Sequence, residues 1–408
     1  MFTNKFFDIL LNLGNDWKVS DVEADYQKED IIIKIKYTNS LIKCSDINED
    51  CKIYDHAPER IWRHLDTMQY KTYISCSLPR YTTDKGKIKT IIPPWASKHE
   101  RHTYLFERAV IDLLRATKNQ TKTSEIMRCG FNIVNRIMHL STKRGLARRD
   151  ISKEEFEHLS IDEKSFKKGH NYITVLSQPK TGNVLDVEEN RTKEATEKLI
   201  NKTLTKQQQK KVKTISLDMW KAYITVSKKM LVNSEIVHDR FHLIKYLNDA
   251  IDKVRRREVK TNEELINSRW AMLKNQQNLT EKQRLKFEAI SNANYEISRA
   301  WRVKENFKDL FNKEEDKKAV FNLFMRWIQS AKDHKIREVT KVAEMFNNHF
   351  AGVLNAIVTT YNNAMAERLN GKIQEIKTVG KGYRTFKNFR SAILFFHGGL
   401  NLYPLNSW

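Results

Sequence analysis

The order of short apolar segments between residues 158 and 237 constrains the fold most. Three strand-like segments, at 158–166, 172–177 and 184–189, follow one another, and residues 180–183 supply a turn between the last two. The remaining segments are a helix at 193–204, a strand at 212–217, a helix at 220–230 and a strand at 235–237. The order is therefore βββαβαβ.

This order predicts a mixed sheet with helices on its faces, which is the arrangement of an RNase H-like core. From about residue 243 to 358 the spacing is helical and charged, and the stretch contains three tryptophans and no proline. We predict a long all-helical insertion here. A last helix, at about 356–377, then returns to the core.

A β-rich module and three helices precede this core. Apolar segments at 31–37, 72–78 and 88–92 predict strands, and the first sixteen residues predict a short helix. After residue 98, the spacing predicts three helices: Thr121 or Thr123 would cap the second, and the third runs from about 132 to 142. The third helix has an outward polar face of Asn132, Asn135, Arg136, His139 and Lys143. This face is typical of a helix-turn-helix recognition helix, although other three-helix bundles share the pattern.

The charge balance indicates a polyanionic partner. The 408 residues include 73 Lys and Arg against 50 Asp and Glu, a formal net charge of +23. A membrane partner is disfavoured, because neither a long apolar span nor a basic amphipathic anchor is evident. Four scattered cysteines without an export signal indicate free thiols in a reducing cytoplasm. We expect a cytoplasmic protein that binds nucleic acid.

Three carboxylates are the candidate catalytic residues. In an RNase H-like sheet the first strand lies beside the fourth, so Asp162 in the first and Asp218 at the end of the fourth can meet. Glu367 lies in the last helix, where polar residues recur from 363 to 374 at spacings of four, three and four. Cutting or joining a phosphodiester requires cations held by oxygen ligands, which converging carboxylates provide.

Basic residues accompany these acids, as suits a phosphate substrate held near a metal ion. The segment 372–390 has six basic residues against one acid and is interleaved with aromatic residues, which suits a DNA backbone. Outside the third helix, the residues expected to contact DNA are Arg144, Lys164, Lys167, Lys168, Arg368, Lys372, Lys377, Lys381 and Arg384. A further polar pair, Asp239 and His242, follows the last strand and is either a helix cap or part of the site.

Several motifs resemble the ISL3 family of bacterial insertion-sequence transposases, which belong to the DDE class. The resembling residues, within about 44–400, are Trp62 to Asp66, Leu78 to Arg80, Pro94 to Ala96, Arg144 to Leu146, Ile161 to His170, Leu217 to Trp220, His238 to His242, Ser268 to Trp270, Ala366 to Ile373 and Gly382 to Phe386.

The resemblance implies a catalytic triad of Asp162, Asp218 and Glu367 that holds two Mg²⁺ or Mn²⁺ ions. It implies double-stranded DNA, namely the element's terminal inverted repeats and a target, as substrate. Asp239 and His242 look like the Asp-x-x-His motif of several such enzymes, where it supports catalysis or holds the site together. Because two transposon ends must be brought together, we expect a homodimer or larger assembly.

One departure from the family concerns zinc. Its N-terminal zinc-ribbon pattern begins with Cys-x-x-Cys, whereas Cys44 and Cys51 here have six residues between them. Together with His56 and Cys76 they do not make a recognised spacing, so we expect a degenerate module without structural zinc.

The predicted protein is thus an α+β multidomain chain. Its expected regions are a β-rich DNA-binding module at 1–98, a helix-turn-helix domain at 99–150, an RNase H-like catalytic domain at 151–242 and 356–392, a helical insertion at 243–355 and a C-terminal tail at 393–408. The tryptophans of the insertion would either pack between helices or stack on a displaced base. Two other functions remain open: a catalytically silent DNA-binding protein derived from a transposase, or an RNase H-like nuclease or resolvase.

Overall fold

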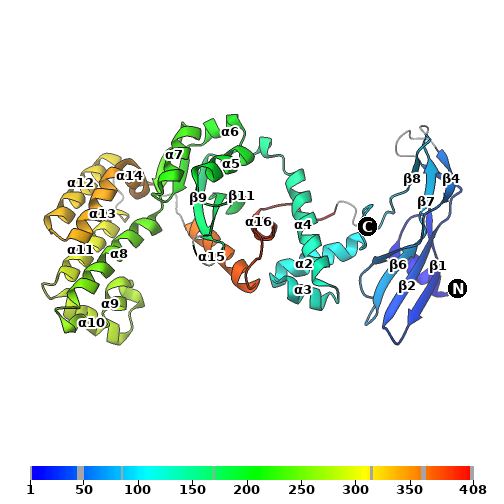
Figure 1. The fold of residues 1–408 in the computed structure, drawn as a ribbon, viewed down its shortest axis with the longest axis horizontal. Helices are drawn as coiled ribbons and strands as arrows, with labels where there is room; N and C mark the ends of the chain where they lie inside the picture. Colours follow the sequence, from blue (N-terminus) through cyan, green and yellow to red (C-terminus); the bar gives the residue numbers. More distant parts are fainter. Residues whose placement is uncertain are drawn as a thin grey trace. The chain divides into compact units, whose positions relative to one another are not determined.

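The computed structural model describes residues 2–43, 50–83, 86–167, 169, 171–312, 316–359 and 364–404, and the side chains of residues 2, 43, 364–368 and 370 fall outside this description. The chain divides into two compact units, Met1–Arg149 with Ile376–Trp408, and Asp150–Glu375 (Figure 1). Each unit contains strands and helices, and each has a mixed sheet, so the expected α+β class is confirmed.

The β-rich module of the first unit combines one helix with two sheets. Its helix is α1 (Phe2–Leu11). The strands of the first sheet are, in spatial order, β1 (Trp17–Asp25), β2 (Asp30–Tyr37), β6 (Lys71–Cys76) and β5 (Arg60–Arg63). Those of the second sheet are, in spatial order, β3 (Leu41–Lys43), β4 (Asp50–His56), β7 (Pro79–Thr82) and β8 (Ile88–Thr90). Alternate residues Ile31, Ile33 and Ile35 are buried with Trp62 and Trp95, as strand alternation requires. The expected helix and strands are confirmed.

The cysteines of this module lie on separate sheets. Cys51 is on β4 and Cys76 is on β6, while Cys44 falls outside the described residues. Burial raises the pKa of the Cys76 thiol to about 12, so this thiol keeps its proton at neutral pH. The absence of structural zinc stays a prediction.

Buried His64 makes the stability of this module depend on pH. Its side chain is 8% exposed, its Nδ1 lies 2.9 Å from Thr103 Oγ1, and burial, with a smaller effect of Arg63, lowers its pKa from 6.5 to about 4. Between these values the unfolded chain binds more protons than the folded chain. We therefore expect this residue to cost up to roughly 3 kcal/mol of stability as the pH falls from about 6.5 to 4. Thermal unfolding of wild type and His64→Gln measures this loss, which should be smaller in the variant; equal losses would contradict it.

Three helices follow and share a core with the C-terminal part of the chain. They are α2 (Tyr104–Thr117), α3 (Gln120–Ile126) and α4 (Phe131–Arg148), and α16 (Phe386–His397) packs against α4. The core contains Val110, Leu114, Val134, Ile137 and Met138 from the first helices, with Ile376, Ala392, Phe395 and Leu402 from the C-terminal part.

The prediction that Thr121 or Thr123 caps the second helix is wrong. Asn119 caps α3, and its side chain accepts a hydrogen bond from the Lys122 backbone N–H at 3.0 Å.

Helix α4 continues through Gly145, beyond residue 142, where the sequence analysis ended it. A Cβ atom at Gly145 would lie 2.7 Å from Leu400 Cβ, so only glycine allows the C-terminal residues to approach this closely. Glycine costs about 1 kcal/mol of helix propensity relative to alanine. Packing against the C-terminal residues offsets this cost, and the helix ends at Arg148.

The second unit is built on a five-stranded sheet of order β11-β10-β9-β12-β13. Its strands are β9 (His158–Ser165), β10 (Tyr172–Gln178), β11 (Asn183–Glu189), β12 (Thr214–Leu217) and β13 (Glu235–His238); its helices are α5 (Lys193–Thr203), α6 (Lys206–Lys211) and α7 (Lys221–Met230). The first three strands are antiparallel, whereas β12 is parallel to β9 and β13. Each predicted strand and helix of this sheet region is present, and α6 was not predicted.

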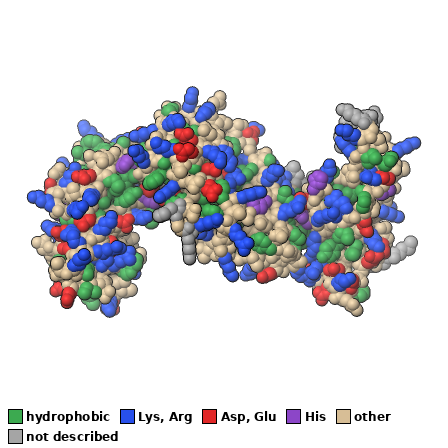
Figure 2. All heavy atoms as spheres, viewed as in Figure 1, with side chains coloured by type: hydrophobic (Ala, Val, Ile, Leu, Met, Phe, Trp, Pro, Cys, Tyr) green, Lys and Arg blue, Asp and Glu red, His purple; other side chains and the backbone are tan. Residues whose placement is uncertain are grey.

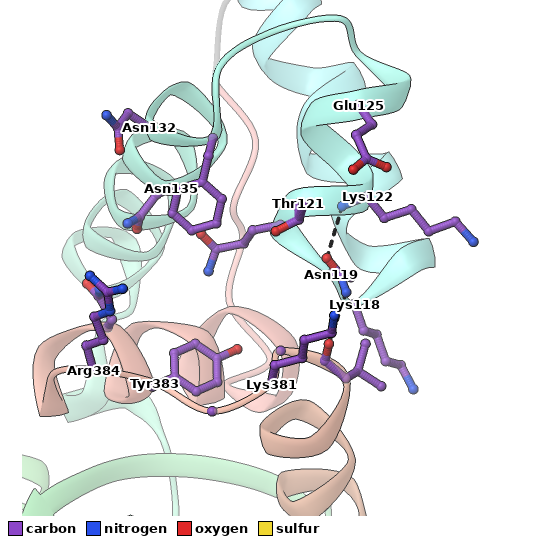
Figure 3. Close-up of a pocket in the computed structure, with 16 residues that line it drawn as sticks. Lys118, Asn119, Thr121, Lys122, Glu125, Asn132, Asn135, Lys381, Tyr383 and Arg384 are labelled. Atoms are coloured by element: carbon purple, nitrogen blue, oxygen red, sulfur yellow. Dashed lines mark hydrogen bonds between the residues drawn. The ribbon is translucent and has the colours of Figure 1, made fainter.

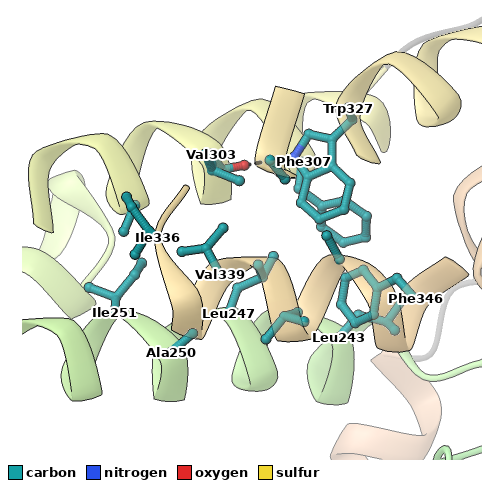
Figure 4. Packing of buried hydrophobic residues seen from close by; sticks show 14 of the residues in the cluster. Leu243, Leu247, Ala250, Ile251, Val303, Phe307, Trp327, Ile336, Val339 and Phe346 are labelled. Atoms are coloured by element: carbon teal, nitrogen blue, oxygen red, sulfur yellow. Dashed lines mark hydrogen bonds between the residues drawn. The ribbon is translucent and has the colours of Figure 1, made fainter. Parts of the chain in front are cut away.

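The stretch predicted as a helical insertion consists of helices and has its own core (Figure 4). It consists of α8 (Arg240–Glu258), α9 (Arg269–Leu273), α10 (Glu281–Ser291), α11 (Glu296–Leu310), α12 (Lys317–Asp333), α13 (Arg337–Asn348) and α14 (Phe350–Val358). Trp327 is buried, and its Nε1 donates a hydrogen bond to the Val303 carbonyl at 2.8 Å. Trp301 packs edge-on against Phe287, whereas Trp270 is 52% exposed. Two of the three tryptophans therefore pack within the insertion.

The prediction of one helix over 356–377 is wrong. Helix α14 ends at Val358, where Thr359 adopts an extended conformation, and α15 (Ala364–Val379) is a separate helix. Two β-branched residues at this point, Val358 and Thr359, lose side-chain freedom in a helix and weaken its continuation. Asn363 falls outside the described residues. Within the part of the chain that the structure describes, none of the helices is both long and apolar enough to cross a bilayer.

Candidate catalytic and DNA-binding sites

Strands β9 and β12 bring Asp162 and Asp218 to the same level of the sheet. The strands are parallel neighbours, with Ser216 paired to Ser160. Asp218 directly follows β12, and extending this register by two residues from Ser216 and Ser160 pairs it with Asp162 on β9. Their side chains are 17% and 15% exposed, so both carboxylates lie largely within the protein surface.

Helix α8 places two further side chains against these acids. His242 Nε2 lies 3.9 Å from Asp162 Oδ1, and His242 Nδ1 lies 3.6 Å from Asp218 Oδ2. Both separations exceed hydrogen-bond length, so the imidazole stands beside the two acids without being bound to either. One turn later, Tyr246 Oη donates a hydrogen bond to Asp218 Oδ1 at 3.1 Å. Burial and the Asp218 charge raise the pKa of Tyr246, which therefore remains a donor.

The two carboxylates fit a divalent cation. Asp162 Oδ2 is inaccessible to solvent, and among the described residues it accepts no hydrogen bond; Lys164 Nζ lies 2.9 Å from it as an ion pair. Two acids that converge at one site repel each other, and hard cations that bind oxygen relieve this repulsion. In the described part of the chain, the search for three or more His, Cys, Asp or Glu side chains able to hold a metal ion finds none.

The third expected acid, Glu367, is in α15, but its side chain falls outside the described part, as does that of Arg368. Its convergence with Asp162 and Asp218 stays a prediction. Lys168 is also outside the described residues.

Asp239 is the N-cap of α8. It is 7% exposed and accepts a hydrogen bond from the Phe241 backbone N–H at 2.8 Å. Next to it, Arg240 donates hydrogen bonds to the carbonyl oxygens of Ala356 and Thr359, at 3.0 and 2.7 Å. These contacts fix the start of the helix that carries His242 and tie it to the end of α14.

Two residues of the expected DNA-binding set are hydrogen-bonded to other helices of the first unit. The outward position expected for His139 is wrong, because its ring makes hydrogen bonds with Asn388 Oδ1 at 2.8 Å and Ser391 Oγ at 2.7 Å on α16. Arg144 donates a hydrogen bond to buried Glu107 at 2.6 Å. The His139 side chain therefore connects α4 to α16, and the Arg144 side chain connects α4 to α2.

The other described members of the set differ in exposure. Arg136 is exposed but pairs with Glu100 at 3.0 Å. Lys164 pairs with Asp162, and Asn135 and Lys377 are half-buried. The remaining exposed side chains are Asn132, Lys143, Lys167, Lys372, Lys381 and Arg384. Basic side chains are spread over both units on the face shown in Figure 2, so charge alone does not locate the DNA.

A groove of about 840 Å³ lies in the first unit (Figure 3). One wall is the start of α3, a second is the first turns of α4, and the third is the segment 379–384, which is called the α15–α16 loop below. The lining residues are Lys118, Asn119, Gln120, Thr121, Lys122, Glu125, Phe131, Asn132, Asn135, Val379, Gly380, Lys381, Gly382, Tyr383, Arg384 and Asn388.

Tyr246 and the basic residues at the start of α3 were not among the site residues predicted from the sequence. Tyr246 lies four residues after His242 in a helix whose cap was recognised, and this spacing places both on one helix face. Lys118 and Lys122 precede the recognition helix in sequence, and only the fold places them across from the α15–α16 loop.

Two family models match this chain, and so do curated transposases. The transposase model of family ISL3 matches residues 159–393, and the model for the helix-turn-helix domain of transposase family ISL3 matches residues 91–141. The chain is 24% identical to the transposase for insertion sequence element IS1001 of Bordetella parapertussis, over 93% of this chain and 96% of that protein. It is also 24% identical to the transposase for insertion sequence element IS1557 of Mycobacterium tuberculosis, over 93% and 92%.

Members of the DDE class generally use divalent metal ions, and a helix-turn-helix domain indicates DNA as the partner. The first model covers more than half of the chain, and the second accounts for the helices before it. The chain belongs to the ISL3 family of DDE transposases.

Proposed function

We propose that this protein is an active transposase that binds the terminal inverted repeats of its insertion sequence, cleaves the DNA at the element's ends and joins those ends to target DNA. The observation that carries this proposal is the convergence of Asp162 and Asp218 from parallel strands beside His242. We further propose that the five-stranded sheet is an RNase H-like core, which its order β11-β10-β9-β12-β13 supports.

In this proposal Asp162, Asp218 and Glu367 would hold two Mg²⁺ or Mn²⁺ ions. Such ions, when bound, activate an attacking oxygen and stabilise the leaving oxygen. Tyr246 fixes one oxygen of Asp218 through its hydrogen bond, which leaves the other carboxylate oxygen available as a ligand. His242 lies within 4 Å of both acids, where it can exchange a proton with the reacting DNA oxygen or with water.

We propose that DNA contacts come from both units. We expect Lys164 on β9 and Lys167 just after this strand to bind DNA phosphates near the two acids. We expect Asn132 and Asn135 on α4 to form hydrogen bonds with base edges. Two element ends must meet before joining, so the working form would be a dimer or larger assembly acting on the bacterial chromosome in the cytoplasm.

The test is an end-cleavage and strand-transfer assay with the full chain and a duplex that carries the element's own ends. We expect nicked ends and joined products with Mg²⁺ or Mn²⁺, and neither with EDTA. Glu367→Gln should remove both products, whereas Glu375→Gln, a matched change on an exposed part of α15, should not. An active Glu367→Gln variant would exclude this glutamate as the third acid.

The same assay separates the alternatives. A protein that binds the ends but neither cuts nor joins them would be a silent DNA-binding derivative. Cleavage without any joined product would indicate a nuclease or resolvase.

A further inference from the structure

We propose that the α15–α16 loop, although about 240 residues distant from the helix-turn-helix in sequence, forms one wall of its DNA-binding groove and contacts the sugar-phosphate backbone of duplex DNA. This inference rests on the proposed function, since it concerns how the protein holds its DNA substrate. It adds a second, non-contiguous segment to the DNA-binding site.

The charge of the groove suits a phosphate backbone. Four basic side chains line it against a single acid, Glu125. Lys122, Lys381 and Arg384 are exposed, and among the described residues none of the three forms an ion pair. Cations without a protein partner, facing one groove from two walls, can neutralise successive phosphates.

Two side-chain oxygens among the lining residues suit hydrogen-bond donors on base edges. Gln120 Oε1 and Asn135 Oδ1 are buried, and within the described part of the chain neither accepts a hydrogen bond. Unsatisfied buried oxygens are costly, so a ligand that donates hydrogen bonds to them gains affinity. Asn132 and Asn135 lie together on the α4 wall in Figure 3, and asparagine pairs with the edge of adenine in the major groove.

The loop is held in place against α3. Asn119, which caps α3 through its side-chain oxygen, donates a hydrogen bond from Nδ2 to the Val379 carbonyl at 3.0 Å. The backbone N–H groups of Gly380 and Gly382 bind the carbonyls of Ile376 and Lys377, at 3.0 and 2.8 Å. The turn requires φ of +87° at Gly382, a conformation that favours glycine. Lys381 and Arg384 are therefore presented by a fixed turn.

The groove is too small to enclose a duplex, which fixes the mode of binding. At about 840 Å³ it has the size of a pocket for a small molecule, whereas the major groove that receives a helix is itself about 12 Å wide. One DNA strand would lie along the groove while α4 meets the base edges. The loop then contacts the backbone beside the recognition helix.

The experiment measures binding of the full chain to a fluorescent duplex with one terminal inverted repeat, and to a random duplex, over a range of salt concentrations. Lys381→Ala/Arg384→Ala should weaken binding to both duplexes at least about tenfold and lower the salt slope by about 1.8, because two phosphate contacts are lost. Lys317→Ala/Lys318→Ala, which removes two exposed charges at the start of α12, is the matched control and should change neither value appreciably.

Asn132→Ala/Asn135→Ala should instead reduce the preference for the repeat and leave the salt slope unchanged, since base contacts carry the specificity. The inference is overturned if the loop variant keeps the affinity and slope of the control variant. If wild type cleaves and joins the ends in that case, only the loop's role fails. If wild type shows no preference for the repeat but the loop variant still loses affinity for both duplexes, the proposed function fails and the loop's backbone contact stands.

Discussion

Replacing Asp162 or Asp218 by asparagine is expected to reduce DNA end cleavage by about a thousandfold or more. Asparagine keeps the shape of the side chain but removes the negative charge and one strong oxygen ligand. The two acids are level in the sheet and share His242 as a neighbour, so neither can take over the position of the other. End cleavage under saturating DNA and Mg²⁺ measures the loss.

The control for this experiment is Asp249→Asn, which removes a carboxylate from an exposed position of α8, three residues after Tyr246. Cleavage by this variant should stay within about twofold of wild type, because surface changes rarely alter function or stability. DNA binding by Asp162→Asn and Asp218→Asn should also remain near wild type. Substantial cleavage by either aspartate variant would mean that the acids of the site are elsewhere.

Replacing Phe307 by alanine is expected to destabilise the helical insertion by about 3–5 kcal/mol. Phe307 is fully buried, and its ring centroid lies 4.7 Å from that of Trp327 and 5.1 Å from that of Phe346. The lost aromatic contacts and the cavity that remains both contribute to the cost. Because α8 packs against α11 and α13, the same change should also weaken the placement of His242 and lower end cleavage.

Urea unfolding followed by circular dichroism and tryptophan fluorescence measures this destabilisation. A chain of several domains need not unfold in one step, so the transition reported by the insertion is the relevant one. Leu285→Ala, at a side chain 64% exposed, is the matched control and should shift the midpoint little. Equal midpoints for the two variants would show that Phe307 is not central to the insertion's core.

The parts of the fold that could be predicted are those that local pattern determines. The strands of the second unit show apolar alternation, and the long insertion shows helical spacing without proline, so both were predicted within a few residues. The end of α14 was not predicted, because the helical apolar pattern continues up to the β-branched residues that terminate it. The continuation of α4 was not predicted either, since the reason for Gly145 is its contact with Leu400, a residue distant in sequence.

The same distinction applies to the candidate site. Strand order predicted that Asp162 and Asp218 would lie close, and a carboxylate oxygen of each lies within 4 Å of His242. The partners of His139 could not be predicted, because Asn388 and Ser391 are about 250 residues away. An exposed polar residue on a helix and one bonded to a distant helix look alike in sequence. Tertiary packing decides between them.

The core shared by α2, α4 and the C-terminal residues affects how the protein can be made. Ile376, Phe395 and Leu402 complete the apolar cluster around Val110 and Met138. During synthesis, the ribosome releases the first helices long before the residues that finish their core, and domains otherwise tend to fold from the N-terminus as they emerge. A chain interrupted before residue 376 would leave this cluster exposed. The helix-turn-helix would therefore complete its core only after the residues from 376 onward have been synthesised.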